Sequence, residues 1–73
     1  MSSVVKIGTG RIKLIGGGGT FAFVACDDDS PDVFVGHATI IESGIALQRG
    51  DHVSFSAVVA PKGLRATSLK LVD

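Results

Sequence analysis

The chain has 73 residues, which is enough for one small domain, and we expect that domain to span residues 1–73. Seven basic and seven acidic residues give a formal net charge of zero, which argues against strong nonspecific binding to duplex nucleic acid, because such binding depends on neutralising phosphates. The sequence has no long apolar run for a membrane-spanning helix and no signal-peptide pattern, and with its single cysteine, Cys26, it is predicted to be cytoplasmic.

Short apolar segments separated by turn-forming residues predict five β-strands, at 11–15, 20–26, 33–35, 52–60 and 64–72. Glycines, the acidic segment DDDSPD and the tripeptide PKG occupy three of the four connections and are typical of turns. The long connection after the third strand is of mixed character, and we expect a short helical turn at 38–41. Five strands with short connections predict a small all-β barrel.

Alternation of side chains along the second and third predicted strands places aromatic residues on one face. Phe21 and Phe23 point away from Val24, and Phe34 points away from the two valines beside it. Because a barrel has only one interior, one of these two apolar faces is expected to point outward. An exposed aromatic patch is typical of a binding or association surface.

The opposite faces of the strands supply the predicted hydrophobic core. Phe55 is the one aromatic ring expected inside it, within a strand whose apolar and polar residues alternate. The predicted core consists of Ile12, Val24, Val33, Val35, Ile40, Leu47, Val53, Phe55, Ala66 and Leu69.

Four segments, in order, resemble the cold-shock domain family. GRIKLIGGGGTFAFV at 10–24 is similar to the family pattern G-x-V-K-W-F-N-x-x-K-G-F/Y-G-F-I, and DVFVGHATI at 32–40 is similar to D-V-F-V-H-F-S-A-I. LQRGDHVSF at 47–55 and PKGLRATSL at 61–69 are similar to the family's L-x-x-G-x-x-V-x-F and G-x-x-A-x-x-V segments. The resemblance implies a five-stranded antiparallel barrel of the oligonucleotide-binding (OB) type that binds single-stranded RNA or DNA.

The resemblance also implies which residues bind, since family members stack bases on aromatic residues and contact phosphates with basic ones. Phe21 and Phe23 match the aromatics of the first ribonucleoprotein motif, Phe34 matches the first aromatic of the second, and Lys13 matches the lysine before the family's tryptophan. The predicted nucleic-acid site is Lys13, Leu14, Phe21, Phe23, Phe34, His37, Lys62 and Arg65, with Arg11 nearby.

Several residues depart from the family pattern. Leu14 and Ile15 replace the tryptophan and the phenylalanine after it, Gly19 replaces the loop lysine, Gly36 replaces the second-motif histidine, and His37 replaces the next phenylalanine. These departures predict weak binding with little sequence preference. They also keep a second interpretation open, in which the more aliphatic face holds a second copy of the chain or a protein partner.

Other candidate sites are not supported by their spacing. The glycine run leads into a strand and lacks the lysine of a phosphate-binding loop, and CDDDSPD lacks the spacing of a calcium loop. His37 and His52 have no further pair of ligands for zinc. Because no catalytic constellation is present either, we expect neither an enzyme nor a metal or cofactor.

Overall fold

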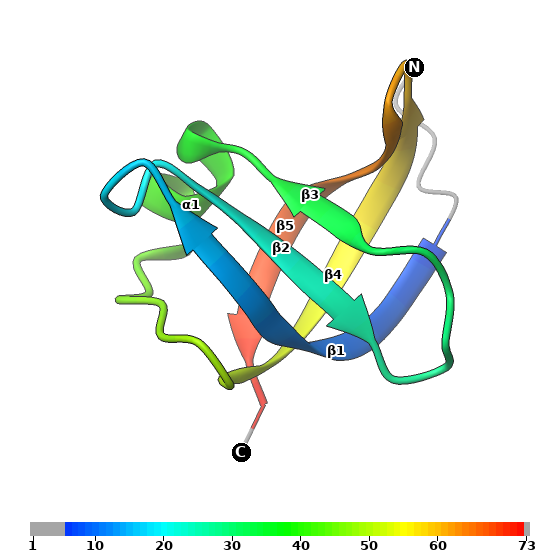
Figure 1. The fold of residues 1–73 in the computed structure, drawn as a ribbon, viewed down its shortest axis with the longest axis horizontal. Coiled ribbons are helices and arrows are strands. Elements are labelled where there is room, and N and C mark those ends of the chain that lie inside the picture. The colour runs from blue at the N-terminus through cyan, green and yellow to red at the C-terminus, as the bar shows by residue number, and fades with distance from the viewer. Residues whose placement is uncertain (1–5, 73) are drawn as a thin grey trace.

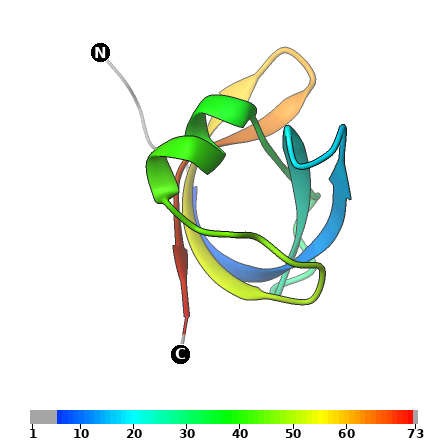
Figure 2. The same ribbon diagram turned by 90° about the vertical axis from the view of Figure 1, so that its left-hand side faces the viewer.

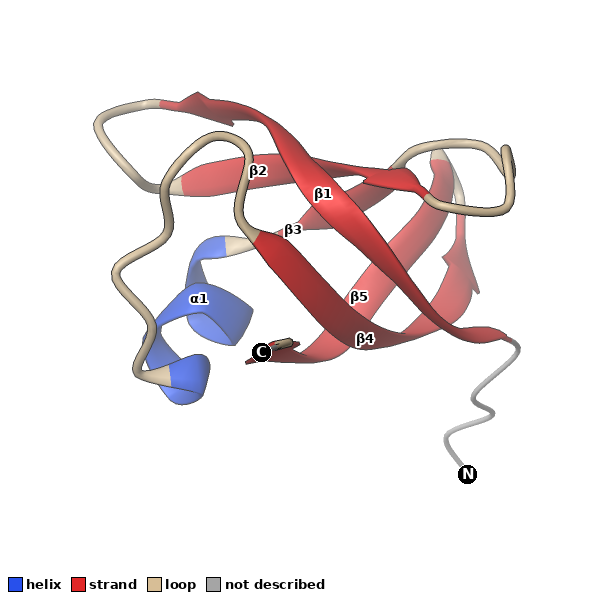
Figure 3. Cartoon of the chain, turned by 90° about the horizontal axis from the view of Figure 1, so that it is seen from below, coloured by secondary structure: helices blue, strands red, loops and turns tan. Residues whose placement is uncertain are grey.

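The computed structural model describes residues 6–72, which form a closed barrel with the strand order β1-β2-β3-β5-β4 (Figures 1 and 2). One short helix, α1, covers part of the barrel between β3 and β4 (Figure 3). The elements are β1 Lys6–Gly16, β2 Phe21–Cys26, β3 Val33–Val35, α1 His37–Ser43, β4 His52–Ala60 and β5 Gly63–Leu71. The OB-type five-stranded barrel predicted from the sequence is confirmed.

The structure differs from the expectation in one strand pairing and in the extent of two elements. β3 and β5 run parallel, with Val33 opposite Leu64 and Phe34 opposite Arg65, so the barrel is mixed rather than wholly antiparallel. β1 begins at Lys6 rather than at Arg11, because its first half pairs with β4 while its second half pairs with β2. The helix spans 37–43 instead of the shorter turn at 38–41. Residues 1–5 lie outside the described residues, so the fold of the predicted domain's N-terminal end is not described.

The core follows the predicted alternation closely. The buried hydrophobic side chains include eight of the ten predicted residues, and Phe55, which is 3% exposed, is among them. Ile40 and Leu47 are only partly buried, because they lie in α1 and the following loop rather than in a strand, and they pack against the core. Ala22, Cys26 and Ala57 are buried as well, since they share inward faces with predicted core residues.

Side-chain hydrogen bonds link the acidic connection between β2 and β3 to β1 and β4. Asp28 accepts a 2.7 Å hydrogen bond from the Nζ of Lys6, and this partner holds the pKa of the Asp28 carboxyl well below its usual range. Asp27 accepts a hydrogen bond from the Thr9 hydroxyl, and its Oδ2 lies 2.8 Å from His52 Nε2. These two contacts lower the pKa of the Asp27 carboxyl. The acidic segment therefore connects the β2–β3 loop to β1 and β4 through side-chain contacts.

No helix within residues 6–72 is long and apolar enough to cross a membrane.

Candidate functional site

Three phenylalanine rings form a cluster on the outer face of β2 and β3, and we call this cluster the aromatic platform. Phe23 lies directly opposite Phe34 in the antiparallel register, and Phe21 lies two residues before Phe23, at the start of β2. The ring centroids are 6.2 Å apart for Phe21 and Phe23, 5.5 Å for Phe23 and Phe34, and 6.3 Å for Phe21 and Phe34. All three side chains are half-buried, while the alternate residues of both strands are buried in the core.

The planes of the platform rings have two orientations. Phe21 and Phe34 are inclined to each other by only 25°, whereas Phe23 stands at 83° to Phe21 and at 64° to Phe34. The edge-to-face arrangement of Phe23 is a favourable geometry for aromatic contacts and fixes the cluster. The two nearly parallel rings are suited to flat apolar ligands, because such ligands can stack on both without a large change of tilt.

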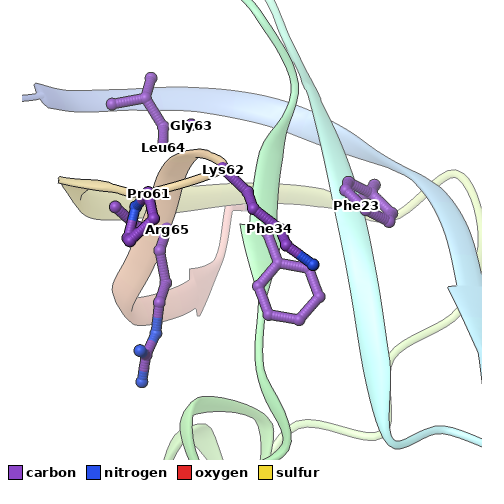
Figure 4. Close-up of a pocket in the computed structure, with 8 residues that line it drawn as sticks. Phe23, Phe34, Pro61, Lys62, Gly63, Leu64 and Arg65 are labelled. Atoms are coloured by element: carbon purple, nitrogen blue, oxygen red, sulfur yellow. The ribbon is translucent and has the colours of Figure 1, made fainter.

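A groove of about 540 Å³ borders the platform on the side of the β4–β5 turn. Its floor is apolar, and two cations, Lys62 and Arg65, stand at its rim. Figure 4 shows Phe34 between Phe23 on one side and Arg65 on the other. The groove is lined by Phe23, Phe34, Ala60, Pro61, Lys62, Gly63, Leu64 and Arg65.

A second hollow, of about 320 Å³, borders the opposite side of the platform and is lined by Lys13, Leu14, Phe23 and Asp32. A β-bulge between Ile12 and Leu14 shifts the register of β1 against β2. Because a bulge sets two residues against one on the partner strand, Lys13 and Leu14 are both exposed there, and Leu14 lies opposite Phe23.

The cations on the two sides of the platform have different partners. The Nζ of Lys13 lies 2.8 Å from a carboxylate oxygen of Asp32, and both side chains are solvent-exposed, so this pair contributes little to stability. Lys62 and Arg65 form no ion pair with a carboxylate in the described part of the chain. Arg11 donates a 3.1 Å hydrogen bond to the carbonyl oxygen of Gly50 and lines neither hollow.

The structure therefore brings together seven of the eight residues predicted for the site. His37 is the exception: it is the first residue of α1, is exposed, and lines neither hollow beside the platform. Gly36 stands next to Phe34, and a side-chain carbon there would lie 3.6 Å from the Phe34 ring, which is an ordinary contact distance. Gly19 lies in the β1–β2 turn with open space around it.

Sequence reasoning missed five residues that line the groove and the hollow, namely Asp32, Ala60, Pro61, Gly63 and Leu64. Pro61 and Leu64 reach the platform through the parallel pairing of β3 with β5, which joins segments about thirty positions apart and carries no local signal. Asp32 could have been found from the sequence. It directly precedes β3, which pairs with β2, and β2 pairs in turn with β1, the strand that carries Lys13.

Comparisons with known proteins identify the family of the chain. A family model described as "'Cold-shock' DNA-binding domain" matches residues 8–72. The chain is 36% identical to the Major cold shock protein of Micrococcus luteus over 61 residues, covering 82% of this chain and 91% of the relative. It is 34% identical to Probable cold shock protein A of Mycolicibacterium smegmatis over 64 residues, covering 86% and 96%.

A solved structure, Drosophila Unr CSD456, superposes on the barrel with a TM-score of 0.73 at 19% identity. The superposition covers 93% of this chain and 27% of that one, and at this identity it supports the fold alone.

Proposed function

The chain belongs to the cold-shock DNA-binding domain family, a family of nucleic-acid-binding rather than catalytic domains, and from this premise we propose that it binds single-stranded RNA or DNA. The observation that carries the proposal is the aromatic platform, with its three half-buried rings on the outer face between a groove and a hollow that both carry cations. Phe21, Phe23 and Phe34 stack the bases, and every base has a π-face on which to stack.

The phosphates are contacted at the rim of the platform. Lys62 and Arg65 are exposed at the edge of an apolar groove and carry no carboxylate partner within residues 6–72, so they are available to the backbone of a bound strand. Lys13 contacts the bound nucleic-acid strand from the opposite side, beside Leu14. Its ammonium group is already paired with the Asp32 carboxylate, which weakens its attraction for a phosphate. His37, at the start of α1, lines neither hollow beside the platform, and we expect it to contribute least to binding.

Binding is proposed to be weak and of low sequence specificity. Leu14 offers an aliphatic surface, which covers less of a base than an aromatic ring does, and Gly19 and Gly36 offer no side chain at all. With three aromatic rings the stacking energy is limited, since each base contributes about 1–3 kcal/mol. Stacking on a bare ring also discriminates poorly between bases, because it uses no base-edge hydrogen bonds.

Fluorescence anisotropy with end-labelled single-stranded oligonucleotides tests the proposal. The label belongs on the nucleic acid, because the chain has neither tryptophan nor tyrosine. Pyrimidine-rich and mixed sequences, as RNA and as DNA, are titrated with protein at low and moderate salt. Saturable binding that weakens with added salt and with Phe21→Ala supports the proposal.

The absence of binding at hundreds of micromolar, from a protein shown to be folded, would contradict it. The rival use of the same surface is then self-association or binding of a protein partner. Sedimentation equilibrium of the chain and of Phe23→Asp separates these outcomes, because a concentration-dependent mass that the charge abolishes identifies a dimer through the platform.

A further inference from the structure

We infer that Gly16 is a positioning residue for Phe21: the ring of Phe21 lies against the bare α-carbon of Gly16, and this contact sets the ring's place in the aromatic platform. The two residues are direct partners across the β1–β2 hairpin. A side-chain carbon added at Gly16 would lie within 2.7 Å of the three tip atoms of the ring, Cζ, Cε1 and Cε2. Ordinary carbon–carbon contacts are about 3.5–4.0 Å, so no other residue fits there while the ring keeps its position.

The distances indicate which part of the ring meets Gly16. Cε1 and Cε2 would lie 2.6 and 2.7 Å from the added carbon, on either side of the closer Cζ. This near-symmetry places the added carbon over the tip of the ring. An aromatic ring that covers a glycine on the neighbouring strand is a recognised means of fixing both in a β-sheet.

Gly16 is not needed for its backbone conformation. It is absent from the glycines with positive φ, whereas the next three residues, Gly17, Gly18 and Gly19, all have positive φ and form the turn itself. Any L-residue can therefore adopt the Gly16 backbone, and the three atoms nearest to an added side chain all belong to the Phe21 ring. This distinguishes Gly16 from its neighbours in the same run.

The consequence for the proposed function is that the side of the Phe21 ring whose tip lies against Gly16 is less open to a base than its other side. The covered side of the ring faces Gly16, and the ring plane that results lies within 25° of the Phe34 plane. A side chain at position 16 would push the Phe21 ring away and break this alignment. The effect on base stacking rests on the proposed binding of single-stranded nucleic acid, whereas the position of the Phe21 ring against Gly16 is independent of that proposal.

NMR of the unliganded protein tests the position directly. We expect nuclear Overhauser contacts between the Phe21 ring protons and the Gly16 α-protons, and a ring-current shift of those α-protons that Phe21→Ala removes. The absence of both from the folded protein would overturn the inference. Because no nucleic acid is present, this result is independent of whether the proposed function is correct.

Binding variants test the consequence. Gly16→Ala is expected to lower oligonucleotide affinity in the direction of Phe21→Ala, whose expected loss is between about 5-fold and 150-fold. In the Phe21→Ala background, Gly16→Ala should change the affinity less than twofold, because its effect passes through that ring. Gly8→Ala, also on β1, is the matched control, since its added carbon would come no closer than 3.5 Å to any atom and Gly8 lines neither hollow beside the platform, so it should leave affinity unchanged.

If Gly16→Ala lowered the oligonucleotide affinity by the same factor with and without the Phe21 ring, the two losses would be additive and the inference would be overturned. Should Gly16→Ala fail to fold, the double variant with Phe21→Ala decides. Recovery of the fold identifies the ring as the source of the clash, and continued failure contradicts it.

Discussion

Phe23 and Phe34 lie directly opposite each other on neighbouring strands, with their ring centroids 5.5 Å apart and their planes inclined at 64°. Each ring stands over a strand whose adjacent residues are buried valines or alanines. The barrel interior thus supports the pair from beneath while leaving its upper surface open to a ligand. Both rings also line the groove that carries Lys62 and Arg65.

Phe34→Ala is expected to weaken binding of a single-stranded oligonucleotide by about 5-fold to 150-fold, because it removes one stacking surface and one wall of the groove. Anisotropy titration at fixed salt measures the change. Ile7→Ala is a suitable control, since Ile7 is 78% exposed on β1 and lines neither hollow beside the platform. Equal affinity of Phe34→Ala and the wild type would contradict the proposed role of the platform.

Phe55→Ala is expected to lower the free energy of unfolding by about 3–5 kcal/mol, because it removes the one fully enclosed aromatic ring and leaves a cavity. A domain of this size has little stability to lose, so the variant should be largely unfolded at room temperature. Urea denaturation followed by circular dichroism measures the effect. Phe34→Ala, a truncation of a half-buried ring, should cost less, and a near-native urea midpoint for Phe55→Ala would refute the core assignment.

Lys62→Gln is expected to reduce the salt dependence of binding. For single-stranded nucleic acid, each neutralised phosphate contributes about 0.7 to the slope of log affinity against log salt, so the slope should fall by about that amount. The measurement is a set of anisotropy titrations over a range of sodium chloride concentrations. Lys70→Gln on β5 makes the same charge change away from both hollows and should leave the slope unchanged.

The domain is expected to lose stability in acid through Asp28. Its folded-state pKa is depressed by the Lys6 ammonium and by Ser30, so the carboxylate favours the folded state above the ordinary carboxyl pKa of about 4. That contribution falls away as the pH drops below this value toward the lower folded-state pKa. Thermal unfolding between pH 7 and pH 2 measures it.

Asp28→Asn should flatten the acid branch of that profile. Asp29→Asn, a neighbouring acidic residue that forms no ion pair within residues 6–72, provides the control. Parallel profiles for Asp28→Asn and the wild type would show that this contact does not set the acid sensitivity.

Local patterns in the sequence predict the two faces of the barrel. The alternation of Phe21, Phe23 and Phe34 with buried valines specifies which side chains point outward, because successive residues of a strand face opposite ways. The same rule locates Phe55 inside the barrel. It fails for Ile40 and Leu47, which lie outside the strands, where apolar character alone does not distinguish full from partial burial.

Relationships between distant segments are beyond the reach of such patterns. The parallel pairing that sets Phe34 beside Arg65 depends on how the barrel closes, and no residue type signals it. The contact of Phe21 with Gly16 is also hidden, because a run of four glycines indicates only a turn. Its first member is distinguished from the rest by the ring that covers it and not by any property of the run.

The closed order β1-β2-β3-β5-β4 has a consequence for how any partner can be recognised. In the described chain every strand has a neighbour on both sides over at least part of its length, which limits the sheet edge to which an extended peptide could add as an extra strand. The same closure protects the fold against edge-to-edge aggregation. Recognition at the aromatic platform is made by side chains, and changing a few of them can alter the ligand while the backbone scaffold stays intact.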